Sequence, residues 1–213
     1  MTPPNFGGEL RRLHLPITRG VQVSAEAANI YAHEGFPDEE MRTGFRRYVE
    51  ALVAVLQAHL GGEEEMTWPL LRQRLPDVSY DTLRVEHRAM EGTLQEITKA
   101  LEARDMRIFL HLQVLQEQWT EHRSLEETEL SSEATASALT SEDHESLAQQ
   151  LADHMQAVAQ PSETVLPFIL YNLPPGERSA VMQRLPSAIA DDMISDPWLE
   201  SWAPMRPFLL SAP

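Results

Sequence analysis

The sequence contains no cysteine. Disulfide bonds, thiolate metal sites, iron–sulfur clusters and thiol catalysis are therefore excluded together. A metal in this protein would have to be bound by histidine and carboxylate side chains. That donor set suits iron, manganese or zinc far better than copper(I).

A long apolar run is also lacking. No stretch reaches the length of about 18 apolar residues that a membrane span needs, and residues 165–170, among the most apolar, are broken by Pro167. We therefore expect no membrane span. Residues 1–5 show no basic-then-apolar signal pattern, which favours a cytoplasmic location.

Positive charge is scarce as well. The chain has 17 Lys and Arg against 33 Asp and Glu, a formal net charge of −16 at pH 7. Phosphate backbones are bound by basic surfaces, so this balance argues against nucleic acid as a partner. With 42% hydrophobic and 23% charged residues, the composition is that of a folded globular protein.

Apolar residues recur at spacings of three and four along most of the chain, and sustained alternation is missing. This pattern predicts an all-α fold. Long helices joined by short turns are typical of an up-and-down four-helix bundle. Pro16 should kink the first helix, and Asp38 is a suitable N-cap for the second. The four expected helices span about 9–32, 39–74, 79 or 81 to 104, and 105–131.

The rest of the chain is predicted to form a C-terminal helical extension. We divide the chain into a metal-binding bundle, residues 1–132, and a linker with a helical extension that packs on it, residues 133–213. The small, polar stretch 132–141 is expected to be the linker. The last residues, 196–213, are expected to pack irregularly on the bundle, because a free tail would not carry two Trp and a Phe. Further helices are expected at about 142–159 and from about Pro175, with the segment 161–171 between them.

One short motif, His-x-x-x-Glu-Glu, occurs twice, at residues 59–64 and 122–127. Residues four apart in an α-helix project within about 40° of each other, one turn apart. The His and the first Glu of each motif can therefore chelate one ion. Apolar residues at helical spacing direct both motifs inward, and a buried carboxylate needs a metal or a strong partner.

The other two bundle helices each offer one histidine, His14 and His87. The same order of ligands is then repeated in two hairpins, with 45 residues from His14 to His59 and 35 from His87 to His122. We therefore predict a pseudo-twofold site on the bundle axis, in which two metals take imidazole nitrogens and two glutamates bridge them. Each imidazole should need a hydrogen-bond acceptor on its other nitrogen. The predicted ligands are His14, His59, Glu63, His87, His122 and Glu126.

This arrangement resembles the hemerythrin or HHE cation-binding family over roughly residues 9–132. Residues 59–70 are similar to that family's His-x-x-x-Glu-Glu followed by an aromatic-Pro-Leu ending, and residues 86–87 and 122–126 match as well. Residues 166–186 resemble, more loosely, the extensions of bacterial members. The resemblance implies a non-haem diiron centre with four terminal histidines and two bridging glutamates. Manganese is the alternative metal.

The sequence departs from the oxygen-carrying hemerythrins at one position. Those proteins place a second histidine four residues after the third-helix histidine, and here that residue is Glu91. Either the site has six protein ligands and more open coordination, or Glu91 is a seventh ligand or a hydrogen-bond partner of a ligand. Such iron suits redox turnover better than reversible O₂ carriage. His111, three turns before His122, is a further candidate for contact with a ligand.

Gly61 and Gly62 stand between His59 and Glu63 in the first motif. Each glycine costs about 1 kcal/mol relative to alanine inside a helix. They could allow local distortion or the close approach of another element. They could equally be tolerated defects, an interpretation that we favour slightly.

The remaining histidines and aromatic residues are assigned structural roles. His144 and His154, in the extension, are expected at the surface. Trp68 and Trp119 are expected to pack in the core rather than to carry electrons.

The favoured function is that of a non-haem diiron protein that binds or reacts with O₂, peroxide or NO in sensing, scavenging or oxidation. A carboxylate-bridged pair can lose two electrons together, as the reduction of O₂ to peroxide requires. The alternatives are a diiron oxygenase acting on a small organic substrate, and an iron- or oxygen-responsive regulatory module without turnover. A plain structural bundle is the least favoured. Enzyme activity stays open, and if present it would be that of a diiron oxidoreductase. The sequence names neither an organic substrate nor a protein partner.

Overall fold

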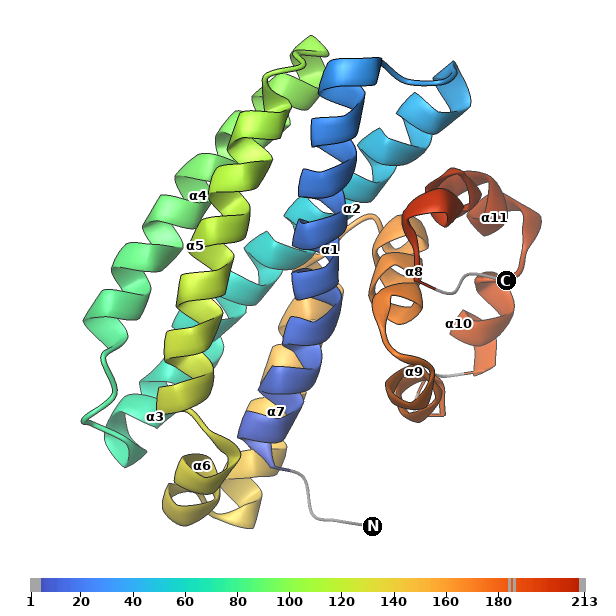
Figure 1. The fold of residues 1–213 in the computed structure, drawn as a ribbon. Helices are drawn as coiled ribbons and strands as arrows, with labels where there is room; N and C mark the ends of the chain where they lie inside the picture. Colours follow the sequence, from blue (N-terminus) through green and yellow to red (C-terminus); the bar gives the residue numbers. More distant parts are fainter. Residues whose placement is uncertain (1–4, 184, 186, 211–213) are drawn as a thin grey trace.

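The protein is all-α, and its long helices form a bundle (Figure 1). The computed structural model describes residues 5–183, 185 and 187–210, and no strand occurs within these residues. None of the helices there is long and apolar enough to cross a membrane. The predicted fold class is thus confirmed. The bundle helices are α1 (Phe6–Glu34), α2 (Glu39–Gly62), α4 (Tyr80–Ala103) and α5 (Ile108–Glu129).

Capping side chains explain where the first two helices begin, and a glycine explains where the first one ends. The Asn5 side chain accepts a hydrogen bond from the Gly8 N–H at the start of α1, and Asp38 does the same for Met41 at the start of α2, as predicted. Gly35 ends α1 with a φ of 77°, a conformation that glycine adopts without strain. Helix α1 continues without interruption through Pro16.

The predicted second helix, 39–74, is divided. After α2, a π-helical turn, η1 (Glu63–Thr67), is followed by α3 (Trp68–Arg74). A π-turn inserts one extra residue into the helical path and is frequently found at functional sites. The single-helix prediction was wrong here, because hydrophobic periodicity does not reveal a one-residue insertion.

The stretch 132–141 is not the expected linker. It contains a helix, because the Ser131 side chain accepts from the Ala134 N–H, and Thr140 with Asp143 forms a capping box for the next helix. The end of the chain is also more regular than predicted up to residue 210. Residues 184, 186 and 211–213 lie outside the described residues. The elements of the extension are α6 (Ser132–Ala138), α7 (Ser141–Val158), α8 (Ser162–Asn172), α9 (Pro175–Met182), α10 (Ser187–Asp192), α11 (Asp196–Trp202) and the 3₁₀ helix η2 (Ala203–Phe208).

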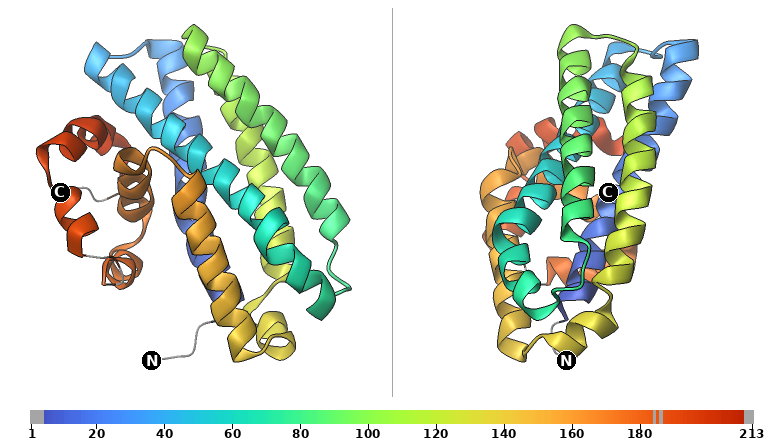
Figure 2. Two further views of the ribbon diagram at one scale, coloured as in Figure 1. Left: turned by 180° about the vertical axis from the view of Figure 1, so that it is seen from behind. Right: turned by 90° about the vertical axis from the view of Figure 1, so that its left-hand side faces the viewer.

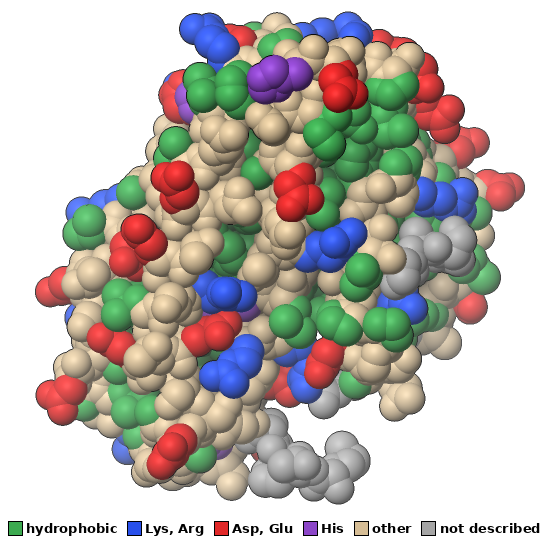
Figure 3. All heavy atoms as spheres, in the orientation of Figure 1, with side chains coloured by type: hydrophobic (Ala, Val, Ile, Leu, Met, Phe, Trp, Pro, Cys, Tyr) green, Lys and Arg blue, Asp and Glu red, His purple; other side chains and the backbone are tan. Residues whose placement is uncertain are grey.

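The extension packs against the first hairpin of the bundle. Helix α7 lies along α2, and α8 and η2 lie farther along the same helix (Figure 2). The side chains of Trp202 and Met205 are fully buried in this contact region. Glycine permits the closest approach, because a β-carbon at Gly44 would overlap the carbonyl oxygen of Pro204. On the face that Figure 3 shows, acidic side chains are scattered, with Lys and Arg between them.

Replacing Gly44 by Ala should lower the free energy of unfolding by about 1–3 kcal/mol, because the backbone at Pro204 must move to make room. Gly92 is the matched control. It is an exposed glycine within α4 with no atom within 4 Å of its β-position, so alanine there should stabilise by about 0.8–1 kcal/mol. Urea unfolding of the two variants measures both effects. Equal stability changes would contradict the close packing of η2 on α2.

His144 is buried, contrary to the surface position that we predicted. It lies on α7, and its Nδ1 accepts a hydrogen bond from the Phe6 backbone N–H at 3.0 Å. The first N–H groups of a helix have no partner within the helix, so the imidazole satisfies one of them at the start of α1. Burial lowers the pKa of His144. The neutral form is therefore the one that joins the extension to α1.

This contact predicts a pH dependence of stability. A histidine whose pKa is lower in the folded state stabilises the protein above its ordinary value of 6.5, and that contribution is lost as the pH falls below it. We expect the free energy of unfolding of the wild type to fall more steeply from pH 7 to pH 5 than that of His144→Gln, which cannot gain this proton. Parallel pH profiles of the two proteins would contradict the assignment.

Candidate metal centre

Six side chains converge between the four bundle helices, and all are only 0–1% exposed. They form two groups with overlapping membership, whose donor atoms lie within 4.8 Å of one another. One group contains His14, His59, Glu63 and Glu126, and the other contains Glu63, His87 and His122. The structure thus brings all six sequence-predicted residues together.

The two glutamates connect the two hairpins. Glu63 Oε1 lies 3.1 Å from His59 Nε2, while its Oε2 lies 3.3 Å from His87 Nε2. Glu126 Oε2 lies 3.2 Å from His14 Nε2 and 3.7 Å from His122 Nε2. Each carboxylate therefore faces one imidazole from each hairpin, which is the pseudo-twofold arrangement that the repeated motif predicts.

The donor atoms fit a cation. The Nε2 atoms of the four histidines and both oxygens of Glu63 and Glu126 are buried, and none has a hydrogen-bond partner within the described residues. Buried polar atoms without partners cost free energy that a bound ion would recover. Imidazole nitrogens and carboxylate oxygens without sulfur suit iron, manganese or zinc. These residues can hold metal ions.

Three of the four imidazoles form a hydrogen bond with a carboxylate through Nδ1, the ring nitrogen that faces away from the centre. His14 Nδ1 lies 2.9 Å from Glu127 Oε1, and His87 Nδ1 lies 3.0 Å from Glu64 Oε1. His122 Nδ1 lies 3.0 Å from Glu86 Oε2. When Nδ1–H donates to a carboxylate, the tautomer is fixed and the Nε2 lone pair faces the centre. These three glutamates were not among the sequence-predicted residues, although the repeated Glu-Glu doublet was the signal for two of them.

A model of the hemerythrin HHE cation-binding domain matches residues 9–134, which include all six donors. The chain belongs to this family. The domain is a metal-binding domain of the type that typically holds iron. No curated protein and no solved structure matches the chain.

Indole rings pack against the histidines of the HHE domain. Trp119 lies 5.2 Å from the His14 ring and 5.7 Å from the His59 ring, and its Nε1–H donates to Thr18 Oγ1 at 3.0 Å. Trp68 stacks on His87 with a centroid distance of 4.8 Å. Both indoles are fully buried, so they exclude water from the centre and restrict the rotation of the imidazoles.

Burial and mutual repulsion set the protonation of the metal-free centre. Burial raises the pKa of Glu63 well above its ordinary value, and the neighbouring Glu126 raises it further. Burial also acts to raise the pKa of Glu126, but the close His14 imidazole and the other nearby imidazoles outweigh it, so that this pKa is lowered. Burial lowers the pKa of His122 to about 4. Without a cation, the HHE domain therefore favours a proton on Glu63 and charge on Glu126.

Gly62 is not a tolerated defect, which is the interpretation that we had slightly favoured for both glycines, whereas a β-carbon at Gly61 would meet His154 Nε2 only at an ordinary contact distance of 3.5 Å. A β-carbon at Gly62 would lie 2.8 Å from Leu151 Cδ1 and 3.1 Å from His154 Cδ2, both on α7. Gly62 therefore allows α7 of the extension to approach the turn between His59 and Glu63 closely. The π-helical turn begins directly after the two glycines. Both the close approach and the local distortion are present.

Glu91 and His111 lie outside both donor groups. Glu91 is exposed on α4, because the inward position after His87 is taken by the fully buried Met90. His111 is partly buried and interacts with Asp105, near the start of α5. The geometry supports neither residue as an additional ligand or as a partner of one.

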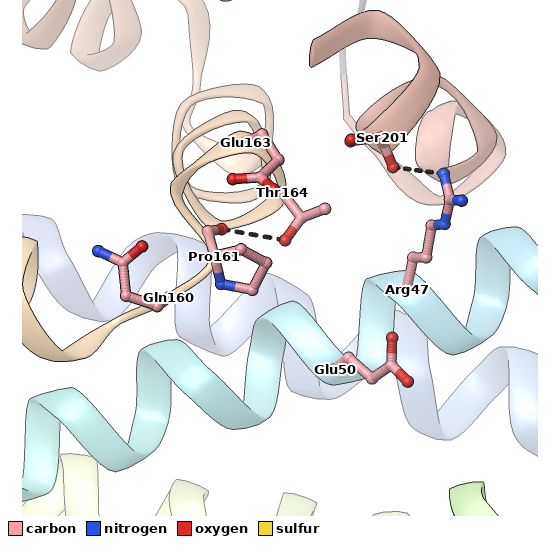
Figure 4. A pocket seen from close by; sticks show the side chains of 7 residues that line it. All are labelled: Arg47, Glu50, Gln160, Pro161, Glu163, Thr164 and Ser201. Carbon is pink, nitrogen blue, oxygen red and sulfur yellow. Dashed lines mark hydrogen bonds between the residues drawn. The ribbon is translucent and has the colours of Figure 1, made fainter. Parts of the chain in front are cut away.

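A surface hollow lies between the α2 segment that precedes the ligands, the start of α8 and the end of α11 (Figure 4). Arg47 reaches across it and donates to the carbonyl oxygens of Glu200 and Ser201 at 2.6 and 2.7 Å. Arg47 precedes His59 by about three helical turns. The hollow therefore belongs to the docking of the extension rather than to the metal centre.

Replacing Glu63 by Gln should stabilise the metal-free protein at pH 7 by about 1–3 kcal/mol, because the buried ionisable group is removed and the amide can donate to Glu126. A carboxyl whose pKa is raised on folding loses stabilisation as the pH rises above its ordinary value of 4.5, so the difference should vanish below that pH. Denaturant unfolding after chelator treatment measures it. Glu50→Gln, at an exposed position of α2, should change stability by less than about 0.5 kcal/mol. A less stable Glu63→Gln protein would contradict this account.

Proposed function

We propose that the HHE domain binds two iron ions through His14, His59, Glu63, His87, His122 and Glu126, and that the loaded centre binds or reduces O₂, peroxide or NO. The two overlapping donor groups, which share Glu63, support two adjacent metal positions. Two carboxylate-bridged iron ions would supply two electrons together, as the reduction of O₂ to peroxide requires. Manganese is the alternative metal for the same donors.

The observation that carries this proposal is the burial of every donor. With the six side chains 0–1% exposed, the described residues leave the centre covered on all sides. A diatomic molecule or peroxide is small enough to reach it by side-chain motion, whereas an organic substrate would need a larger opening. We therefore favour a small ligand over the oxygenase alternative. The chain excludes water, orients four imidazoles and keeps the charge of two carboxylates near the ligand site.

Two histidines at each metal position favour redox turnover or sensing over reversible carriage. Glu91, which stands where oxygen carriers have a further histidine, is exposed, so it leaves the coordination open. Open positions allow a small ligand to bind next to the iron and electrons to pass to it.

A regulatory module is the second candidate, and the contact of α7 with Gly61 and Gly62 favours it. Metal binding would order the η1 turn at Glu63, and Leu151 and His154 pack against the glycines that precede this turn. Metal occupancy would then be coupled to the docking of the extension. Hydrogen exchange of α7 should be slower in iron-loaded than in metal-free protein. Equal exchange would remove this candidate.

Metal analysis of the purified, iron-reconstituted protein tests the main proposal. We expect about two iron ions per chain in the wild type, and at least one ion fewer in His122→Ala and Glu126→Ala. Glu91→Ala and His111→Ala are the matched controls and should keep the wild-type content. Fewer than about one ion per chain in the wild type, or full iron in both ligand variants, would overturn the proposal.

Visible absorption after oxygen is added to the ferrous protein separates turnover from carriage. We expect irreversible conversion to the ferric form. A coloured adduct that bleaches under vacuum would show reversible binding instead, and would remove the redox part of the proposal.

A further inference from the structure

The four histidines of the centre are not supported equally. Glu127, Glu64 and Glu86 accept from the Nδ1–H groups of His14, His87 and His122, respectively. His59 is the exception, because neither of its ring nitrogens has a hydrogen-bond partner within the described residues. Its imidazole makes ring contacts with His14, at 5.1 Å, and with Trp119, at 5.7 Å, and its Nε2 faces Glu63.

The pseudo-twofold axis identifies the residue that is missing. It relates His14 to His87 and His59 to His122, and it exchanges the second glutamates of the two motifs. Glu64 and Glu127 obey this symmetry, since each supports the single histidine of the other hairpin.

The residue before the single histidine breaks this symmetry. Glu86 precedes His87 and supports His122. The equivalent residue, which precedes His14 and would support His59, is Leu13. Leu13 is partly buried and packs against both hydrophobic clusters of the protein, so an apolar side chain stands where the axis would place a fourth carboxylate.

We propose that this difference between Leu13 and Glu86 makes the two metal positions unequal. The position of His87 and His122 has a carboxylate behind both imidazoles, whereas the position of His14 and His59 has only one. A carboxylate that accepts from Nδ1–H makes Nε2 a stronger donor and fixes the ring, and its loss typically weakens metal binding 10–100-fold. The His87–His122 position therefore fills first, and the His14–His59 position fills second and exchanges its metal faster.

This inference rests on the proposed two-metal function and adds an order of loading to it. Between the two steps, the protein holds one ion at the His87–His122 position. Glu63 and Glu126 then each have an oxygen facing an imidazole of the empty position. The second position is consequently the one at which a different divalent ion would enter.

Anaerobic titration of the metal-free protein with Fe(II), with the heat of binding measured by calorimetry, tests the proposal. The wild type should show two binding steps whose affinities differ by about 10–100-fold. Leu13→Glu should tighten the weaker step by about 10-fold or more and leave the tighter step unchanged. Glu86→Leu should weaken the tighter step, so that the two steps approach each other. Glu91→Leu, an exposed position on the same helix, is the matched control and should reproduce the wild-type titration.

Titration with Mn(II), monitored by electron paramagnetic resonance, gives a second readout of the order of loading. At one ion per chain, the wild type should show the six-line signal of an isolated ion, whereas Glu86→Leu should already show spin coupling between two ions. Two indistinguishable steps in the wild type, with no response to either Leu13→Glu or Glu86→Leu, would overturn the inference and leave the diiron proposal intact. Fewer than about one ion bound per chain would overturn both. If Leu13→Glu does not fold, Glu86→Leu decides the question by itself, because its side chain is partly exposed and its loss leaves no cavity in the core.

Discussion

The structure depends on the burial of two carboxylates between four imidazoles. Glu63 and Glu126 are 0–1% exposed. Each faces one histidine of each hairpin, and none of their oxygens has a hydrogen-bond partner within the described residues. Buried charge of this kind is stable only with compensation. Metal ions can provide it, and in their absence the raised pKa of Glu63 favours a proton instead. The packing of the bundle around the centre therefore holds these two carboxylates in place although their burial is electrostatically unfavourable.

The supporting parts come from distant places in the chain. The second glutamate of each motif turns outward and supports a histidine of the other hairpin, so that each motif contributes to both halves of the centre. The π-helical turn at Glu63 separates α2 from α3, and α7 covers the two glycines before it. The extension thus contacts the same segment that carries two of the six donors.

Much of this could be predicted from sequence, because helical periodicity and a doubled motif are local signals. His59 and Glu63 share one helix face whatever surrounds them, and the second copy fixed the order of the ligands. What could not be predicted depends on contacts across the fold. The role of Gly62 requires α7 to be placed beside it, and the burial of His144 requires α1 to begin beside α7. The helix at 132–138 was missed because its small residues carry no apolar stripe, and the caps that start it are single side chains.

The contact between α7 and the glycine pair also has a consequence for how such chains diversify. The segment shared with the family ends at residue 134, within α6, whereas the surface that α7 covers lies in the middle of the shared segment. The segment that the family shares, residues 9–134, is therefore shorter than the part of the chain that packs together around the centre, which also includes α7. A relative that exchanged its C-terminal helices for others could carry a larger side chain at position 62, and one that kept the glycine without α7 would expose bare backbone beside its metal donors. A glycine at position 62 should accordingly be inherited together with an α7-like helix.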